Sequence, residues 1–213
     1  MIDFNVLIPV YNTKPNALIE AVFSVINQKI NQHYKILLVD DGSTDTDTLA
    51  LLDYFQKEGK RGFCEVVVHH LDKNEGTSKA LNYGHSILTS EWIAIMGSDD
   101  VCHESRFDLQ TRFIKGRKLD VLGTGLFGFK NGDIERKPMF KAVHPVSPTP
   151  QNTKDGWMVN HGTVFYRNQA VKDAGHYNPA LRRAQDVDLW KRMYAKGNVF
   201  FNLQEVLYGW RRY

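Results

Sequence analysis

The chain has 213 residues, of which 42% are hydrophobic and 24% charged, which suits one globular domain with a buried core. Its formal charge of +3 at pH 7 is too small to argue by itself for a nucleic-acid partner. Cys64 and Cys102 lie far apart in the sequence, which excludes a disulfide framework and fits a reducing compartment. No run approaches the roughly 18 apolar residues of a membrane span, and no leader pattern is visible. We therefore expect a cytoplasmic protein, or one held peripherally at a membrane, whose oligomeric state the sequence does not indicate.

The first half of the chain alternates predicted strands and helices. Strands are predicted at 4–9, 34–39, 65–70 and 91–96, and helices at 15–28, 45–57 and 77–88. Leu18, Val22 and Val25, for example, give the first helix an apolar face at helical spacing. Strands that alternate with helices of this length imply a mostly parallel sheet with right-handed crossovers.

After residue 100 the alternation becomes less regular. Helices are expected at 105–115, 168–174 and 186–196, and strands at 119–122, 161–166, 199–201 and 206–210. Asn131-Gly132, within 127–136, predicts a hairpin turn. Residues 141–156 contain several prolines and little periodicity, which predicts a mobile loop over the site. The expected fold class is therefore α/β, with a mostly parallel central sheet and a small antiparallel portion in this half.

Two pairs of carboxylates follow apolar strands. Asp40 and Asp41 end the second strand, and Asp99 and Asp100 follow the fourth. Open α/β sheets bind ligands at the carboxyl ends of their strands, and Mg²⁺ or Mn²⁺ prefers carboxylate oxygens shared with substrate phosphates. A single pair is equally well explained as a turn or a helix cap. The repetition of the pattern favours a site for one ligand with a polar head and a metal-bound phosphate.

Two further segments carry candidate chemistry. Gly76 allows a tight turn into a helix, and small residues at Ala80 and Gly84 allow that helix to pack closely on the sheet. Lys79 could reach a phosphate or a base edge, although a solvated helix lysine is the commoner explanation. Asp186 stands at a predicted helix start, where it is either a cap or a general base.

Five motifs resemble, in order and spacing, those of the family 2 glycosyltransferases. They are Ile8-Pro9-Val10-Tyr11-Asn12, Val39-Asp40-Asp41-Gly42-Ser43-Thr44-Asp45, Asn74-Glu75-Gly76, Ser98-Asp99-Asp100 and Ala184-Gln185-Asp186-Val187-Asp188-Leu189-Trp190. The resemblance covers almost the whole chain. It implies a single domain of the GT-A fold over 1–213, with a nucleotide-binding half (1–100) and an acceptor and catalytic half (101–213). It also implies a nucleotide-diphosphate sugar donor, most often a UDP-sugar, a divalent cation (Mn²⁺ or Mg²⁺), and inversion in a single displacement.

The resemblance also assigns roles to particular residues. Asp186 matches the catalytic base, and Asp99 and Asp100 match the metal motif, with Asp100 as the preferred direct ligand. Tyr11 is expected near the face of the nucleobase, and Asp41 is expected to recognise its edge. The positions expected to bind the nucleotide or donor are Pro9, Val10, Tyr11, Asn12, Asp41, Asn74, Gly76, Lys79, Ser98, Asp99, His161 and Arg211.

The chain departs from the family pattern at several positions. Gly97 replaces the usual first acid of the metal motif, and Gln185 stands where a glutamate often precedes the base. Many relatives continue past the final arginine, whereas this sequence stops at Tyr213, which fits a minimal enzyme, a truncated chain or a site completed by a partner. These departures keep open a non-catalytic homologue that binds nucleotide sugars.

The sequence also bears on two other functions and on the acceptor. A sugar-phosphate nucleotidyltransferase would need a glycine-rich basic loop after the first strand, and the residues from Tyr11 to Lys14 do not provide one. The Gly123–Gly128 run matches G-x-G-x-x-G, but no helix is predicted after it, so it is not interpreted as a dinucleotide site. The expected acceptor is a glycan, a glycolipid or another hydroxyl-bearing polymer, with modified nucleic acid as a less favoured case.

Overall fold

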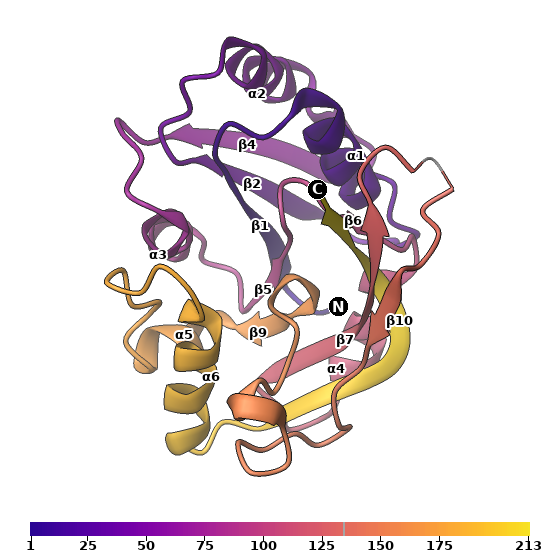
Figure 1. Ribbon diagram of the computed structural model, residues 1–213, viewed down its shortest axis with the longest axis vertical. Helices are drawn as coiled ribbons and strands as arrows, with labels where there is room; N and C mark the ends of the chain where they lie inside the picture. Colours follow the sequence, from indigo (N-terminus) through magenta and orange to yellow (C-terminus); the bar gives the residue numbers. More distant parts are fainter. Residues whose placement is uncertain (134) are drawn as a thin grey trace.

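The structure, a computed structural model, describes residues 1–133 and 135–213 (Figure 1). The strands are β1 (Phe4–Val10), β2 (Tyr34–Asp40), β3 (Lys60–Arg61), β4 (Cys64–His70), β5 (Trp92–Ile95), β6 (Val101–Cys102), β7 (Val121–Lys130), β8 (Phe140–Ala142), β9 (Phe165–Arg167) and β10 (Phe200–Arg212). The α-helices are α1 (Pro15–Ile26), α2 (Thr46–Glu58), α3 (Thr77–Ile87), α4 (Arg106–Ile114), α5 (Asn168–Asp173) and α6 (Gln185–Ala195). Short 3₁₀ turns occur at Lys154–Gly156 and His161–Thr163. No helix in these described ranges is long and apolar enough to cross a bilayer.

One sheet connects the two halves of the chain. Its strand order is β3-β4-β2-β1-β5-β9-β7-β10-β6, with β8 paired to β7. The strands β4, β2, β1 and β5 are parallel, as are β7 and β10, while β9 runs antiparallel between β5 and β7. The short strands β3, β6 and β8 are antiparallel to their neighbours. The prediction of a mostly parallel sheet with an antiparallel portion in the second half is therefore confirmed.

Helices cover both faces of this sheet, and each face has its own apolar cluster. Phe4, Val6 and Ile8 of β1 pack with α1, α2 and α4, whereas Leu7 packs with α3 and the cluster that includes α5 and α6. This alternation is the period of two expected of a strand that is buried on both sides. Figure 1 shows α3, α5 and α6 together on one side and α1 and α2 on the other.

The first-half elements match their predictions to within a few residues because their ends carry strong local signals. Pro15 occupies the first turn of α1, where its missing N–H costs nothing. The Asp45 carboxylate accepts a hydrogen bond from the Thr48 amide, so Asp45 caps α2 and the helix itself begins one residue later than predicted.

The second half differs more from its predictions. The two strands predicted at 199–201 and 206–210 are one strand, β10, with shifted pairing between Asn202 and Val206. A local bulge carries the strand across the residues between the two predicted segments. The strand predicted at 161–166 begins instead with a 3₁₀ turn, and β9 starts only at Phe165. The Gly123–Gly128 run lies inside β7, which agrees with the prediction that it is not a dinucleotide-binding loop.

The region between β7 and β10 contains a strand that was not predicted. The chain turns after Lys130, where the Asp133 amide donates to the Lys130 carbonyl, and β8 then pairs antiparallel with β7. Position 134, within the predicted hairpin, lies outside the described residues. The predicted loop at 141–156 therefore starts with β8 residues and ends with the first 3₁₀ turn. Its mobility stays a prediction.

We expect Gly84→Val to lower the free energy of unfolding by about 1–3 kcal/mol, because overpacking a filled core forces side chains out of place. A Cβ atom at Gly84 would lie 2.4 Å from Cδ1 of the buried Leu7, where α3 packs on β1. Urea denaturation measures the change. Ser86→Ala, exposed on the same helix, is the control and should change stability by less than about 0.5 kcal/mol. Equal effects of the two substitutions would contradict close packing at Gly84.

Candidate functional site

The two carboxylate-bearing strand ends lie at the same edge of the sheet. The amide of Asp41 donates to the carbonyl of Val10, which holds the end of β2 against the end of β1. The hydroxyls of Thr13 and Ser98 are 2.7 Å apart, which joins the segment after β1 to the segment after β5. The motifs that the sequence predicted to meet are therefore neighbours in space.

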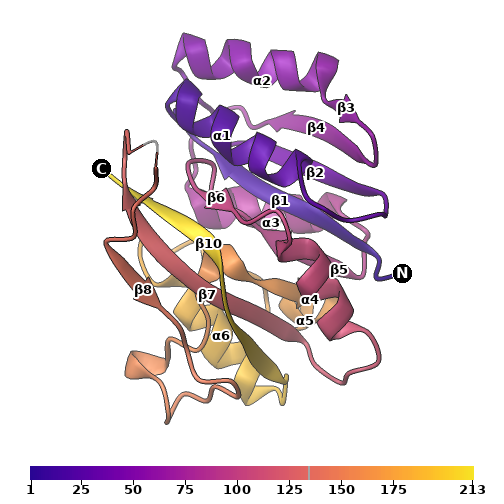
Figure 2. The same ribbon diagram turned by 90° about the vertical axis from the view of Figure 1, so that its right-hand side faces the viewer.

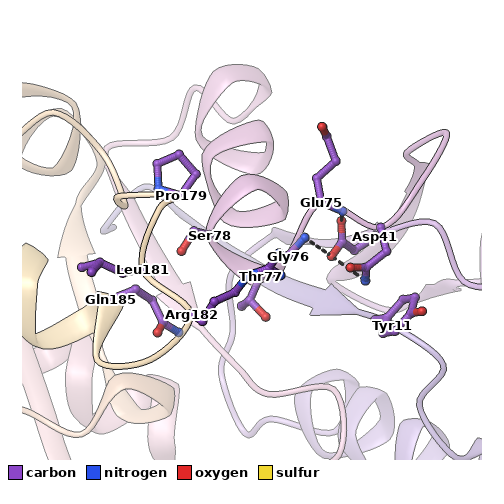
Figure 3. A pocket seen from close by; sticks show the side chains of 11 residues that line it. Tyr11, Asp41, Glu75, Gly76, Thr77, Ser78, Pro179, Leu181, Arg182 and Gln185 are labelled. Carbon is purple, nitrogen blue, oxygen red and sulfur yellow. Dashed lines mark hydrogen bonds between the residues drawn. The ribbon is translucent and has the colours of Figure 1, made fainter.

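The Asp41 carboxylate organises the turn that leads into α3. It accepts hydrogen bonds from the Asn74 side chain (3.0 Å) and from the amides of Glu75 (2.9 Å) and Gly76 (2.8 Å), as Figure 3 shows. Gly76 has φ of 97°, which glycine adopts without strain. A carboxylate has about four lone-pair sites, so Asp41 retains capacity for one more donor.

A pocket of about 250 Å³ opens beside this turn. Its lining is Tyr11, Asp41, Asn74, Glu75, Gly76, Thr77, Ser78, Pro179, Leu181, Arg182 and Gln185 (Figure 3). An exposed aromatic ring, a buried carboxylate, an amide and a guanidinium thus surround one cavity. Such a set can stack on a planar ring and hydrogen-bond to its edge.

Several residues predicted to bind the donor do not line this pocket. Val10 is buried in the core, and Pro9 is only partly exposed on β1. The Asn12 side chain accepts from the amides of Thr44 and Asp45, so it shapes the neighbouring turn. Lys79 forms an ion pair with Glu75 at 2.7 Å, one helical turn away.

Ser98, Asp99, Asp100 and Arg211 form a second group, separate from the pocket. Asp100 is buried, and both of its carboxylate oxygens accept hydrogen bonds. Oδ2 accepts from the Tyr208 hydroxyl (2.6 Å) and Oδ1 from the Arg211 amide (2.8 Å). Burial, reinforced by the nearby charge of Asp99, raises the pKa of Asp100 to about 7.

The glycine at position 97 is required by this arrangement. The Gly97 amide donates to the Tyr208 hydroxyl oxygen at 3.0 Å, while the hydroxyl proton goes to Asp100. A Cβ at position 97 would lie 2.5 Å from Oδ2 of Asp100 and 3.2 Å from the Tyr208 hydroxyl. The first acid of the metal motif is thus replaced by a glycine where any side chain would collide with Asp100 and the Tyr208 hydroxyl.

The Arg211 side chain is buried and satisfied by protein groups. Its Nε donates to the Asp99 carbonyl at 2.6 Å, and its terminal nitrogens donate to Glu20 (2.9 Å) and Asn131 (3.2 Å). Figure 2 shows β10 running toward α1, which carries Glu20. In this structure Arg211 anchors the last strand, and its predicted contact with a diphosphate stays a prediction.

The acidic residues at this edge fit a divalent cation as a pair. Within residues 1–133 and 135–213, no group of three or more His, Cys, Asp or Glu side chains is placed to hold a metal. Asp99 and Asp100 provide two carboxylates, and Mg²⁺ commonly uses one or two together with substrate phosphates. Burial, and to a lesser degree the charge of Asp99, raises the pKa of Asp100, and a bound cation would favour the ionised form of both carboxyl groups.

Asp186 and His161 interact electrostatically at another part of the site. Asp186 is 8% exposed in the first turn of α6, directly after Gln185, which lines the pocket. His161 lies in a 3₁₀ turn, and its Nε2 is 2.8 Å from the Tyr177 hydroxyl. Burial lowers the pKa of His161, and the nearby Asp186 charge acts in the opposite direction. Asp186 therefore adjoins the pocket through Gln185 and acts electrostatically on the partly buried imidazole of His161.

The sequence did not reveal the residues that support this site. Tyr208 and Tyr177 lie outside the five family motifs, so no motif predicted their contacts with Asp100 and His161. Arg106 is fully buried and donates to the carbonyls of Ile95 and Val164. Its side chain could not be predicted as buried, because arginine is normally a surface residue.

Comparison with known proteins gives the family. The Glycosyl transferase family 2 model matches residues 5–175. The amylovoran biosynthesis glycosyltransferase AmsE of Erwinia amylovora is 30% identical over 206 residues, which covers 96% of this chain and 74% of AmsE. The chain therefore belongs to glycosyl transferase family 2.

Two solved structures share the fold. S. aureus TarS (residues 1–349) in complex with UDP-GlcNAc superposes with a TM-score of 0.80 at 24% identity. The matched region covers all of this chain and 59% of the TarS chain. The mannosyltransferase PcManGT of Pyrobaculum calidifontis, in complex with GDP-Man and Mn²⁺, gives a TM-score of 0.73 at 12% identity. The matched region covers 98% of this chain and 57% of the PcManGT chain. The predicted GT-A fold is confirmed.

We expect Tyr208→Phe to lower the free energy of unfolding by about 1–3 kcal/mol at pH 7.5, because buried Asp100 and the Gly97 amide both lose a partner. Denaturant unfolding measures this, with Tyr54→Phe as the control at an exposed tyrosine. The Tyr208 hydrogen bond lowers the pKa of Asp100, so its loss should raise that pKa further. Equal stability of the two variants would show that the Tyr208 hydroxyl contributes nothing.

Proposed function

We propose that the chain transfers a sugar from a nucleotide-diphosphate donor, with a UDP-sugar as the favoured donor, to an acceptor hydroxyl with inversion at the anomeric carbon. One observation carries this proposal. A buried carboxylate, Asp186, lies next to a pocket whose walls include the Tyr11 ring and the Asp41 carboxylate. A base beside a polar, ring-sized cavity is what direct displacement at a nucleotide-bound sugar requires.

The pocket suits the nucleoside end of the donor. Tyr11 is 48% exposed and offers a ring face on which a base can stack. Asp41 retains a lone-pair site that can accept from an imide N–H such as that of uracil. The TarS complex with UDP-GlcNAc, which has the same fold, supports a UDP-sugar as the donor.

A divalent cation is part of the proposal. Asp99 and Asp100 would hold it together with the donor phosphates, and the PcManGT complex with Mn²⁺ supports this choice of cofactor. Asp99 is the more available ligand, because both oxygens of Asp100 already accept hydrogen bonds. The bound cation would offset the negative charge that develops on the leaving diphosphate.

Asp186 supplies the base in this mechanism. Its carboxylate removes the proton of the acceptor hydroxyl while that oxygen attacks the anomeric carbon from the face opposite the diphosphate. The bond to the diphosphate breaks in the same step, so no covalent intermediate with the protein forms. Asp186 lies inside the protein surface, where fixed groups replace water around the reacting atoms.

The acceptor in this proposal is a glycan. AmsE is named for amylovoran biosynthesis, which supports an acceptor that is extended in a biosynthetic pathway. A glycolipid or another hydroxyl-bearing polymer would meet the same chemical requirement.

A non-catalytic binder of nucleotide sugars is the second candidate. Gly97, Gln185 and the hydrogen-bonded state of Asp100 favour it. Incubating the protein with UDP-sugars, Mn²⁺ and oligosaccharide acceptors separates the two candidates. Release of UDP with formation of a glycosylated product supports the enzyme, and tight UDP binding without turnover supports the binder.

Asp186→Asn should lower kcat by about 10²–10⁴-fold, the usual contribution of a positioned base, and leave UDP affinity nearly unchanged. Initial rates and calorimetric titration with UDP measure the two quantities. Asp188→Asn is the matched control, because Asp188 lies on the same helical turn and pairs with Arg192. Equal loss of turnover and UDP affinity in Asp186→Asn would reject the base assignment.

UDP at a hundred times its Kd should stabilise the protein by about 2.7 kcal/mol, and Mn²⁺ should add to the rise in Tm. We expect Asp99→Asn and Asp100→Asn to remove the Mn²⁺ increment and Asp41→Asn to weaken UDP binding itself. Thermal shift with and without Mn²⁺ measures both. Asp108→Asn, at the exposed partner of Arg112, serves as the control. An unchanged Mn²⁺ increment in both Asp99→Asn and Asp100→Asn would place the cation elsewhere.

A further inference from the structure

Two exposed aromatic side chains meet on the part of the sheet that the second half of the chain forms. Gly128 of β7 pairs with Phe140 of β8 on one side and with Trp210 of β10 on the other. The centroids of the Phe140 and Trp210 rings are 6.0 Å apart and the rings are nearly perpendicular, at 85°. Phe140 is 40% exposed and Trp210 is 39% exposed. We call Gly128, Phe140 and Trp210 the aromatic corner.

The glycine in the middle of the aromatic corner makes room for one of the rings. A Cβ atom at position 128 would lie 2.3 Å from Cε1 and 2.5 Å from Cζ of Phe140. Gly128 is not among the glycines with positive φ, so its backbone conformation does not require glycine. The space that the Phe140 ring occupies does require it. Exposed apolar residues that gather in one place mark binding surfaces more often than single ones do.

Two cationic side chains extend the aromatic corner along the same face of the sheet. Lys130 and Arg212 are register partners, and each follows a member of the corner by two residues on its strand. Side chains two residues apart on a strand share a face. The Arg212 guanidinium carbon lies 4.2 Å from the centre of the Trp210 ring. Such stacking leaves the N–H donors in the guanidinium plane available to a ligand.

The carboxylates of the adjoining turn have other partners. Asp133 accepts hydrogen bonds from the amides of Glu135 and Lys137, and the Glu135 carboxylate pairs with the Lys137 ammonium at 2.8 Å. Glu20 of α1 pairs with two other arginines. Over residues 1–133 and 135–213, no carboxylate forms an ion pair with Lys130 or Arg212. The positive charge beside the aromatic corner therefore favours an anionic ligand.

The aromatic corner continues a face of the sheet that already belongs to the candidate site. Tyr208 and Trp210 lie two residues apart, where β10 pairs with consecutive residues of β7, so their side chains leave the same face. The Tyr208 hydroxyl donates to one oxygen of Asp100, and the amide of Arg211, next to Trp210, donates to the other. Figure 2 shows β7, β8 and β10 side by side. The corner therefore begins beside one of the carboxylates proposed to bind the cation.

We propose that the aromatic corner is a subsite for a sugar unit of the acceptor that bears a carboxylate or phosphate group. This inference rests on the proposed function. The C–H groups of a sugar ring form an apolar face, which packs on aromatic rings, and two perpendicular rings contact it from two sides. Arg212 and Lys130 bind the anionic substituent, Arg212 through paired N–H donors. The subsite makes and breaks no bond, and it positions the chain whose hydroxyl reacts.

An acidic glycan fits the aromatic corner better than an anionic membrane surface does. Side chains that anchor a protein at a bilayer insert their apolar parts below the headgroups. Phe140 and Trp210 are instead more covered than exposed, because their rings pack on each other and the Phe140 ring also lies over Gly128. A corner of this kind receives a ring-shaped ligand.

Titration with three oligosaccharides tests the subsite without turnover. The probes are hexagalacturonate, which carries carboxylates, pentamannose 6-phosphate, which carries a phosphate, and neutral maltohexaose. We expect one acidic probe to bind at least about tenfold more tightly than maltohexaose, and Trp210→Ala to weaken that binding about tenfold. Calorimetry measures each Kd. Trp157→Ala, at a tryptophan that is 48% exposed after the first 3₁₀ turn, is the matched control, and Phe140→Ala repeats the test if Trp210→Ala does not fold.

Arg212→Gln separates the contribution of charge from that of stacking. It should remove the preference for the acidic probe and leave the affinity for maltohexaose unchanged. Arg117→Gln is the matched control, because Arg117 also lies 4.2 Å from the centre of an aromatic ring, that of Phe113. UDP affinity should equal that of the wild type in all these variants, because none of the substituted residues lines the donor pocket.

Three results would overturn the subsite. They are no preference of the wild type for an acidic probe, unchanged affinities in both Trp210→Ala and Phe140→Ala, and Trp210-dependent sedimentation with phosphatidylcholine–phosphatidylglycerol vesicles in the absence of oligosaccharide binding. The last result would assign the corner to a membrane surface. A wild-type chain that binds an acidic probe through Trp210 but transfers no sugar would instead overturn the proposed function and leave a glycan-binding corner in place.

Discussion

The rest of the site depends on the hydrogen bonds that the buried Asp100 carboxyl group accepts. Asp100 follows β5, near the middle of the sequence, and accepts hydrogen bonds from Tyr208 and the amide of Arg211, near its end. When the Asp100 carboxyl group is ionised, these hydrogen bonds are short and strong, because they are shielded from water. They fix the last strand across the edge where the first-half strands end. The second half of the chain can therefore contribute groups to a site begun by the first.

The two halves support their acidic residues by different means. Asp41 is held by two backbone amides and the neighbouring Asn74 side chain, all within one turn. Asp100, in contrast, accepts from the Tyr208 hydroxyl and the Arg211 amide, which the distant strand β10 brings to it. Buried polar groups of this kind are tolerated only when their partners are present, so the second set couples site geometry to the packing of the whole domain.

The sequence predicted the first half well because its signals are local. Alternating apolar strands, helix caps and glycine turns act within a few residues, and the carboxylates after β2 and β5 meet at one edge as expected. The bulge that joins the two parts of β10 depends on pairing with β7, which no local pattern encodes. The Tyr208–Asp100 bond spans 108 residues, so the motif identified Asp100 without revealing that its oxygens are already satisfied.

The glycine at position 97 also restricts how such a chain can change by mutation. An aspartate there would enter space that the Tyr208 hydroxyl and the Asp100 carboxylate already fill. Tyr208 would first have to give way to a residue without a hydroxyl, so that Asp100 can move aside. Two positions 111 residues apart are thus coupled, because an acid at position 97 fits this site only together with a change at position 208.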